Sequence, residues 1–128
     1  MRHGPPVIEY AKLERWNTAY IGTTVNITCK IQSPLEANGK FSKNSKQINE
    51  DDEELKYEYH YIHVTKKDKA NSLTLLTKLE VKNVTMEDAG NYTCKAFQDD
   101  NQKSSTTFFL KVGKQTTLLR LFNIMCIQ

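Results

Sequence analysis

The sequence predicts an all-β fold, a sandwich of two antiparallel sheets joined by Greek-key connections. Residues 23–32, 73–81 and 106–112 each alternate between apolar and polar side chains, and helix signals between them are weak. Such alternation is the pattern of a strand with one face on the core and the other in water. The chain has 128 residues, a length that fits one domain. We therefore expect a single sandwich domain.

The predicted strands follow one another with turn residues between them. Residues 5–21 are interpreted as an entry segment, and Gly22 marks the turn into the first clear strand. Residues 33–39 are expected to form a loop after that strand. The expected inward-facing positions of the strands are Val25, Ile27, Cys29, Ile31, Leu73, Leu75, Leu79, Val81, Thr106, Phe108, Leu110 and Val112.

A long polar stretch, residues 49–72, contains one further predicted strand at residues 57–64. Tyr57, Tyr59 and Tyr61 alternate there, so their rings can line one face of the strand. That face is interpreted either as a half-buried strand face or as an aromatic binding strip.

The sequence lacks the patterns of a catalytic or metal-binding site. His60 and His63 are three residues apart, which places them on opposite faces of a strand and disfavours a shared metal. There is no glycine-rich phosphate loop and no Gly-x-Ser-x-Gly motif. We expect neither catalysis nor a cofactor nor a metal.

The segment of residues 88–94, DAGNYTC, is the most informative in the chain. Gly90 permits a tight backbone at a corner, and Tyr92 can bury its ring and return its hydroxyl to a backbone group there. Cys94 faces the same side as Tyr92. This segment resembles the strand F signature of immunoglobulin-superfamily domains, and the resemblance covers roughly residues 5–113.

The resemblance implies an immunoglobulin-like β-sandwich whose two sheets are joined by a disulfide between Cys29 and Cys94. Closing a loop of this length would restrict the unfolded chain and stabilise the fold by about 4 kcal/mol. It would also imply an oxidising compartment.

Two positions of the family pattern concern the core around that disulfide. The family usually has a tryptophan about a dozen residues after the first cysteine; Phe41 has this spacing here, and the only tryptophan, Trp16, lies too early. Asp88 commonly pairs with a basic residue in the family, in a surface pair worth about 0–1 kcal/mol. The candidates for this basic residue are Lys66, Lys67 and Lys69.

A finer resemblance concerns the class of parent protein. Residues 22–29, 33–35 and 83–94 are similar to I-set modules of receptor tyrosine kinases of the vascular endothelial and platelet-derived growth factor receptor kind. Residues 5–8 and 48–52 resemble modules of the interleukin-1 receptor family. Both resemblances imply an extracellular, secreted or cell-surface module that binds a protein ligand, as part of a receptor or as a soluble fragment. The alternatives are a cell-adhesion module with homophilic or heterophilic contacts and an intracellular structural domain of the giant muscle-protein type, with reduced cysteines.

The candidate ligand contacts are in loops, because loops carry binding more often than strands do. They include the acidic residues 50–54, which are otherwise interpreted as a solvated loop. The individual candidates are Pro34, Leu35, Glu36, Asp99, Asp100 and Asn101.

Three Asn-x-Thr sequons, at Asn26, Asn83 and Asn91, are predicted glycosylation sites. Asn26 and Asn91 fall in the outward phase of their strands, and Asn83 falls near a turn. A glycan on Asn91 would keep the outer face of its strand away from a tight partner.

The remaining expectations concern the net charge, contact with membranes and the N-terminal end of the chain. The net charge is +3, and the opposite charges are interspersed along the chain, so we expect no continuous basic face for nucleic acid. No apolar run is long enough to span a membrane, so membrane contact is expected only through a parent receptor. Residues 1–4 are an N-terminal flank without the apolar core of a signal peptide, which favours a fragment of a longer protein.

Residues 114–128 follow the predicted domain as a C-terminal tail or linker. Three interpretations are open: a short element that packs on the domain, the start of a linker, or the product of an alternative exon. Cys126 in this segment is the third cysteine and could form intermolecular disulfides.

Overall fold

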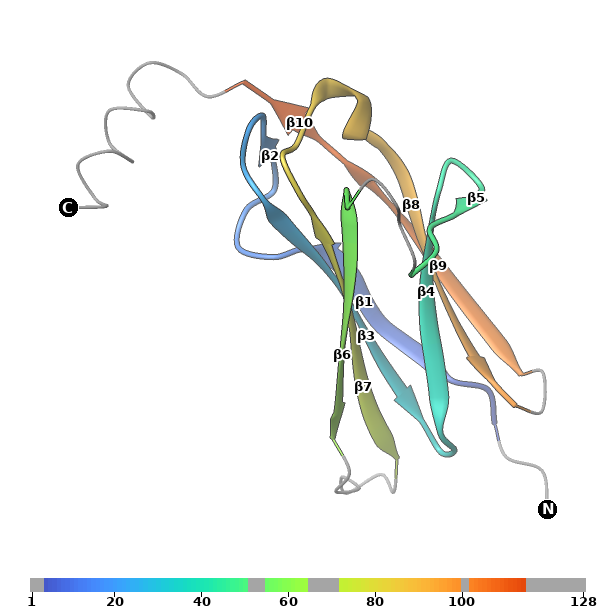
Figure 1. Cartoon of the computed structure of the whole chain (residues 1–128). Coiled ribbons are helices and arrows are strands. Elements are labelled where there is room, and N and C mark those ends of the chain that lie inside the picture. Colours follow the sequence, from blue (N-terminus) through green and yellow to red (C-terminus); the bar gives the residue numbers. More distant parts are fainter. Residues whose placement is uncertain (1–3, 51–54, 65–71, 100–101, 115–128) are drawn as a thin grey trace.

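The structure, a computed structural model, describes residues 4–50, 55–64, 72–99 and 102–114 as two sheets packed face to face (Figure 1). The first sheet is antiparallel with strand order β1-β3-β7-β6. Its members are β1 (Val7–Leu13), β3 (Val25–Ser33), β7 (Leu73–Val81) and β6 (Tyr57–Val64). This arrangement, with its facing sheet, confirms the predicted all-β sandwich.

The second sheet is also antiparallel and has the order β5-β4-β8-β9. A short parallel pair, β2 with β10, closes one end of the sandwich, and the 3-10 helix η1 (Met86–Asp88) connects β7 to β8. The strands are β4 (Ala37–Lys43), β5 (Lys46–Gln47), β8 (Gly90–Gln98), β9 (Lys103–Leu110), β2 (Ala19–Tyr20) and β10 (Val112–Gly113).

The predicted loop at residues 33–39 is wrong in its second half, because β4 begins at Ala37. Asparagine and glycine have low strand propensity, but pairing with β8 holds this segment in the sheet, with Ala37 opposite Gln98. Gly39 faces the core, where a Cβ atom would come within 2.5 Å of the Thr77 hydroxyl. The glycine therefore permits a close approach between the two sheets.

Residues 5–21, interpreted as an entry segment, contain β1, which is a full strand of the first sheet. The pairing of β1 with β3 shifts register between Ile8 and Tyr10. A bulge of this kind inserts one extra residue and reverses the alternation after it. Ile8 and Ala11, three residues apart, consequently both pack against the core. This irregularity hides the strand from a period-two pattern.

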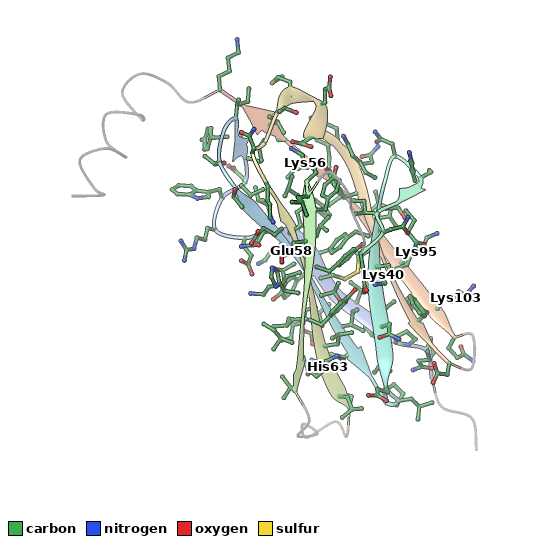
Figure 2. All side chains as sticks on the ribbon, viewed as in Figure 1. Lys40, Lys56, Glu58, His63, Lys95 and Lys103 are labelled. Atoms are coloured by element: carbon green, nitrogen blue, oxygen red, sulfur yellow. A yellow bond between two sulfur atoms is a disulfide. The ribbon has the colours of Figure 1, made fainter. Side chains whose placement is uncertain are left out.

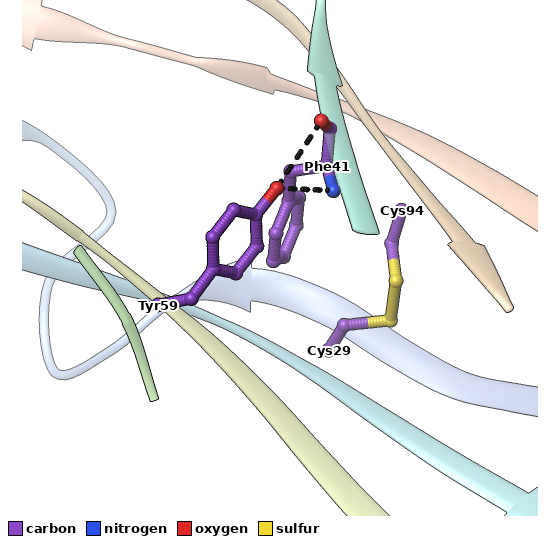
Figure 3. Close-up of a disulfide and its surroundings, with 4 residues drawn as sticks. All are labelled: Cys29, Phe41, Tyr59 and Cys94. Carbon is purple, nitrogen blue, oxygen red and sulfur yellow. Dashed lines mark hydrogen bonds between the residues drawn. A yellow bond between two sulfur atoms is a disulfide. The ribbon is translucent and has the colours of Figure 1, made fainter. Parts of the chain in front are cut away.

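The disulfide between Cys29 and Cys94 joins β3 to β8 at the centre of the core (Figure 3). Both cysteines and Phe41 are fully buried, and Phe41 lies opposite Cys94 in the second sheet. Tyr92 is also fully buried and donates its hydroxyl hydrogen bond to the Asp88 carbonyl, at 2.7 Å. Burial raises the pKa of the Tyr92 hydroxyl well above its usual range.

A second tie between the sheets comes from Tyr59 on β6. The Phe41 amide donates to the Tyr59 hydroxyl at 2.9 Å (Figure 3). That hydroxyl donates in turn to the Ile48 carbonyl at 2.8 Å. Burial raises the pKa of the Tyr59 hydroxyl to about 12. The tyrosine phase of β6 is therefore a half-buried strand face that serves the fold.

Several predicted features lie outside the described residues. They are the basic residues Lys66, Lys67 and Lys69, the acidic residues 51–54, Asp100, Asn101 and the segment 115–128 with Cys126. In the part of the chain that the structure describes, no helix has the length and apolar character needed to cross a membrane.

Candidate binding surface

Four of the predicted loop contacts, Pro34, Leu35, Glu36 and Asp99, lie at one end of the sandwich. Pro34, Leu35 and Glu36 connect β3 to β4, and Asp99 directly follows β8. The Gln98 side-chain amide donates to the Ser33 hydroxyl at 2.7 Å, which brings the two loop bases together. Leu35 and Glu36 also line a pocket of about 430 Å³ between the ends of the two sheets, together with Ser33, Ala37, His63, Val64 and Leu73.

A larger hollow, of about 580 Å³, lies on the outer face of the second sheet. It is lined mainly by Lys40 from β4, Lys95 from β8 and Lys103 from β9, which Figure 2 labels. Gln47, Phe97 and Ser105 complete its outward-facing lining, and we call these six residues the lysine face. No sequence pattern indicated this site.

The strand register brings the lysines of this face together. Lys40 is directly opposite Lys95, and Phe97 is directly opposite Lys103. Like charges at opposite positions on neighbouring strands destabilise a sheet. The interspersed charge of the sequence therefore does not reveal this group of lysines, since residues distant in sequence become neighbours only through pairing.

Only one of the three lysines has an acidic contact among the described residues. Lys40 pairs with the Glu50 carboxylate and lies 4.7 Å from the centroid of the Tyr59 ring. This lysine and the Tyr61 hydroxyl hold the pKa of Glu50 below its usual range. Lys95 and Lys103 are exposed, and the described salt bridges include neither of them.

On the outer face of the first sheet, which we call the paired face, lysines lie beside carboxylates. Lys30 lies 3.1 Å from Glu9, and Lys78 lies 2.9 Å from Glu14. The Thr28 hydroxyl also donates to the Glu14 carboxylate at 2.6 Å. The hydrogen bond from Thr28 is the largest of the interactions that hold the pKa of Glu14 below its usual range, and the contact with Lys78 comes next.

Asp88 and Gly90 of the segment 88–94 lie at the corner between η1 and β8. Gly90 has a φ of 150°, which side-chain-bearing residues rarely adopt. Asp88 is 3% exposed and lies 2.7 Å from Lys56 Nζ, so a surface pair is the wrong description of its environment. Lys56 immediately precedes β6, and its hydrogen bonds to the Lys82 and Asn83 carbonyls hold it over the carboxylate.

The three candidate glycosylation sites differ in exposure. Asn83 and Asn91 are exposed, whereas Asn26 is half-buried in β3 on the paired face, opposite Glu80. Glycosylation at each of them remains a prediction.

A family model described as immunoglobulin domain matches residues 17–107, so the chain belongs to the immunoglobulin domain family. Members of this family are generally non-catalytic. No curated protein matches the chain by sequence.

Solved structures share the fold at low sequence identity. Titin M4 in its trigonal form is 17% identical with a TM-score of 0.60, and the match covers 88% of this chain and 100% of that one. The N-terminal eight Ig domains of Down Syndrome Cell Adhesion Molecule are 20% identical with a TM-score of 0.59, with 86% and 12% covered. Dpr2 Ig1-Ig2 in complex with DIP-Theta Ig1-Ig3 is 15% identical with a TM-score of 0.62, with 87% and 33% covered. The chain thus spans only a small part of the last two, and these identities show the fold alone.

Proposed function

We propose that this chain is a non-catalytic, extracellular immunoglobulin domain that binds a protein partner, as part of a cell-surface receptor or as a soluble receptor fragment. The partner binds the lysine face through an acidic surface of its own. The finer kinship with I-set modules of growth factor receptor kinases, or with the interleukin-1 receptor family, belongs to this proposal and rests on the sequence resemblance.

The lysine face is the observation that carries the proposal. It is hollowed, it presents Lys95 and Lys103 without a described salt bridge, and Phe97 supplies an apolar contact within it. An acidic partner surface would relieve the repulsion between Lys40 and Lys95, and complementary charge directs both specificity and the rate of encounter.

The proposed glycan on Asn91 leaves this face open. Asn91 precedes Lys95 by four residues on the same strand, a separation of about 13 Å. A glycan there would cover the part of the sheet near Phe109, which lies opposite Asn91. A glycan on Asn91 is therefore expected to keep a tight partner away from the first residues of the outer face of β8 only, and not from the whole of that face.

An extracellular location is supported by the buried disulfide, since such bonds persist in oxidising compartments, and by the three sequons. A protein partner is supported by the fold likeness to Dpr2 Ig1-Ig2 in complex with DIP-Theta. The titin likeness favours instead an intracellular structural domain, and the cell-adhesion likeness favours an adhesion module.

The location is tested by expressing the full chain through a secretory pathway and measuring its intact mass without reductant, before and after glycosidase. We expect a loss of mass on deglycosylation and a disulfide between Cys29 and Cys94. An unglycosylated chain with free thiols at both positions would favour the intracellular alternative.

The binding surface is tested by surface plasmon resonance against a panel of cystine-knot growth factors and extracellular immunoglobulin domains. The double variant Lys95→Glu/Lys103→Glu should weaken binding at least tenfold. The control Lys12→Glu/Lys111→Glu has the same change in charge at exposed positions outside the hollow and should change it less than twofold. Equal losses in both variants would place the surface elsewhere, and self-association without binding to the panel would favour the homophilic adhesion module.

A further inference from the structure

Three side chains of metal-ligand type meet on the paired face, on the opposite side of the domain from the lysine face. They are Glu58 and His60 on β6 and Glu80 on β7, and their donor atoms all lie within 4.8 Å of one another. The His60 Nε2 atom is 3.7 Å from a carboxylate oxygen of Glu58 and 3.7 Å from one of Glu80.

The sheet itself assembles this group. Glu58 lies directly opposite Glu80 in the pairing of β6 with β7, and His60 is two residues further along β6, on the same face. Because all three side chains stand on paired strands, their approach requires no loop closure. The same register forces two carboxylates into opposite positions, an arrangement that is unfavourable unless a cation lies nearby.

Lys82 is the cation that the chain itself supplies. Its Nζ atom lies 3.4 Å from a Glu58 oxygen and 3.9 Å from a Glu80 oxygen. Its side chain is 36% exposed, so these contacts are screened by water and a divalent ion can displace the ammonium group at little cost. The divalent ion then supplies two positive charges to the two carboxylates, whereas the ammonium group supplies one.

We propose that Glu58, His60 and Glu80 form a Zn²⁺ site with three protein ligands and a fourth position for water. Zinc bonds of 2.0–2.2 Å in tetrahedral geometry require donor atoms about 3.4 Å apart, close to the two His60 distances. An imidazole with two carboxylates suits zinc, whereas Ca²⁺ requires six to eight oxygen ligands. This site is independent of the proposed protein-binding function.

The test is isothermal titration calorimetry of Zn²⁺ into the full chain. The chain carries Cys126→Ser, which removes the thiol outside the disulfide, and Asn26 is deglycosylated because it neighbours Glu80. We expect one site per chain. His60→Ala and Glu80→Gln should each weaken binding at least tenfold, while His63→Ala, on the other face of β6, should leave it unchanged. Lys82→Gln should tighten binding by about two- to fivefold, since it removes the competing cation.

Unfolding midpoints of all variants, measured without metal, separate loss of ligands from loss of fold. The substituted histidine is 47% exposed, so His60→Ala should keep the midpoint of the parent chain. The proposal is overturned if no binding occurs at about 1 mM Zn²⁺, if His60→Ala binds as the parent does, or if Ca²⁺ competes equally with Zn²⁺.

Discussion

The lysines on the two outer faces of this sandwich have opposite surroundings. On the paired face each of three lysines lies within 4 Å of a carboxylate, as Lys30 with Glu9, Lys78 with Glu14 and Lys82 with Glu58. On the lysine face, Lys40 contacts a carboxylate, whereas Lys95 and Lys103 have no salt bridge in the part of the chain described. Charge that is matched within the domain contributes to stability, whereas unmatched charge is available to a partner. Glu14→Gln and Lys95→Glu test this difference directly, while Lys56→Met and Tyr59→Phe test buried contacts against exposed ones.

The largest effect is expected where the first sheet joins the corner before β8. Lys56→Met removes the cation beside Asp88, whose side chain is 5% exposed, and should lower the free energy of unfolding by about 3 kcal/mol because a buried charge loses its partner. Lys46→Met on the exposed strand β5 removes the same charge and should cost less than about 0.5 kcal/mol. Urea denaturation measures the free energy of unfolding of both variants. Equal losses would mean that Lys56 stabilises the domain no more than an exposed lysine does.

Tyr59→Phe tests the tie between the two sheets. It deletes the hydroxyl that accepts from the Phe41 amide and donates to the Ile48 carbonyl, so the unfolding free energy should fall by about 2 kcal/mol. Tyr61→Phe is the matched control. Its hydroxyl contacts Glu50 near the surface, so the cost should stay below about 1 kcal/mol. A larger loss for Tyr61→Phe would show that the exposed cluster holds the sheets together.

Glu14→Gln tests whether the paired face stabilises the fold. The expected loss is about 1 kcal/mol at pH 7, since the charged acceptor of Thr28 and the partner of Lys78 are both weakened. The pKa of Glu14 is lowered in the folded state from its ordinary 4.5. The stabilisation is therefore fully present above about pH 4.5 and is lost as the pH falls through the folded-state pKa. Unfolding curves of both proteins between pH 3 and 7 should converge at the acid end, and a constant gap would contradict this assignment.

The smallest effect has the opposite sign. Lys95→Glu places a carboxylate opposite Lys40 and should raise the free energy of unfolding by about 0.5 kcal/mol. Lys78→Glu on the paired face should lower it, because Glu14 would then have a like charge beside it. Thermal unfolding distinguishes the two directions. Destabilisation by Lys95→Glu would mean that acidic groups of the domain itself already pair with Lys95.

Much of the fold could be predicted because its signals are local. The alternation in β3, β7 and β9 and the corner residues Gly90 and Tyr92 each depend on neighbours in sequence. The strand β1 could not be predicted in this way, because its bulge changes the alternation phase. The buried partner of Asp88 could not be predicted either, since Lys56 is 32 residues away and is brought there by the packing of β6.

The sequence by itself determined the all-β class and the inward phase of the main strands, because burial imposes a period of two on each strand separately. The pairing of Cys29 with Cys94 was implied by the family resemblance. Only the tertiary structure decided which outward residues became neighbours. Lys40 and Lys95 meet through the register of β4 with β8, and Glu58 and Glu80 meet through the register of β6 with β7. Register depends on how the whole core packs, and a shift of one residue would move each of these side chains to the other face. The lysine face and the Glu58–His60–Glu80 group are therefore properties of the folded domain.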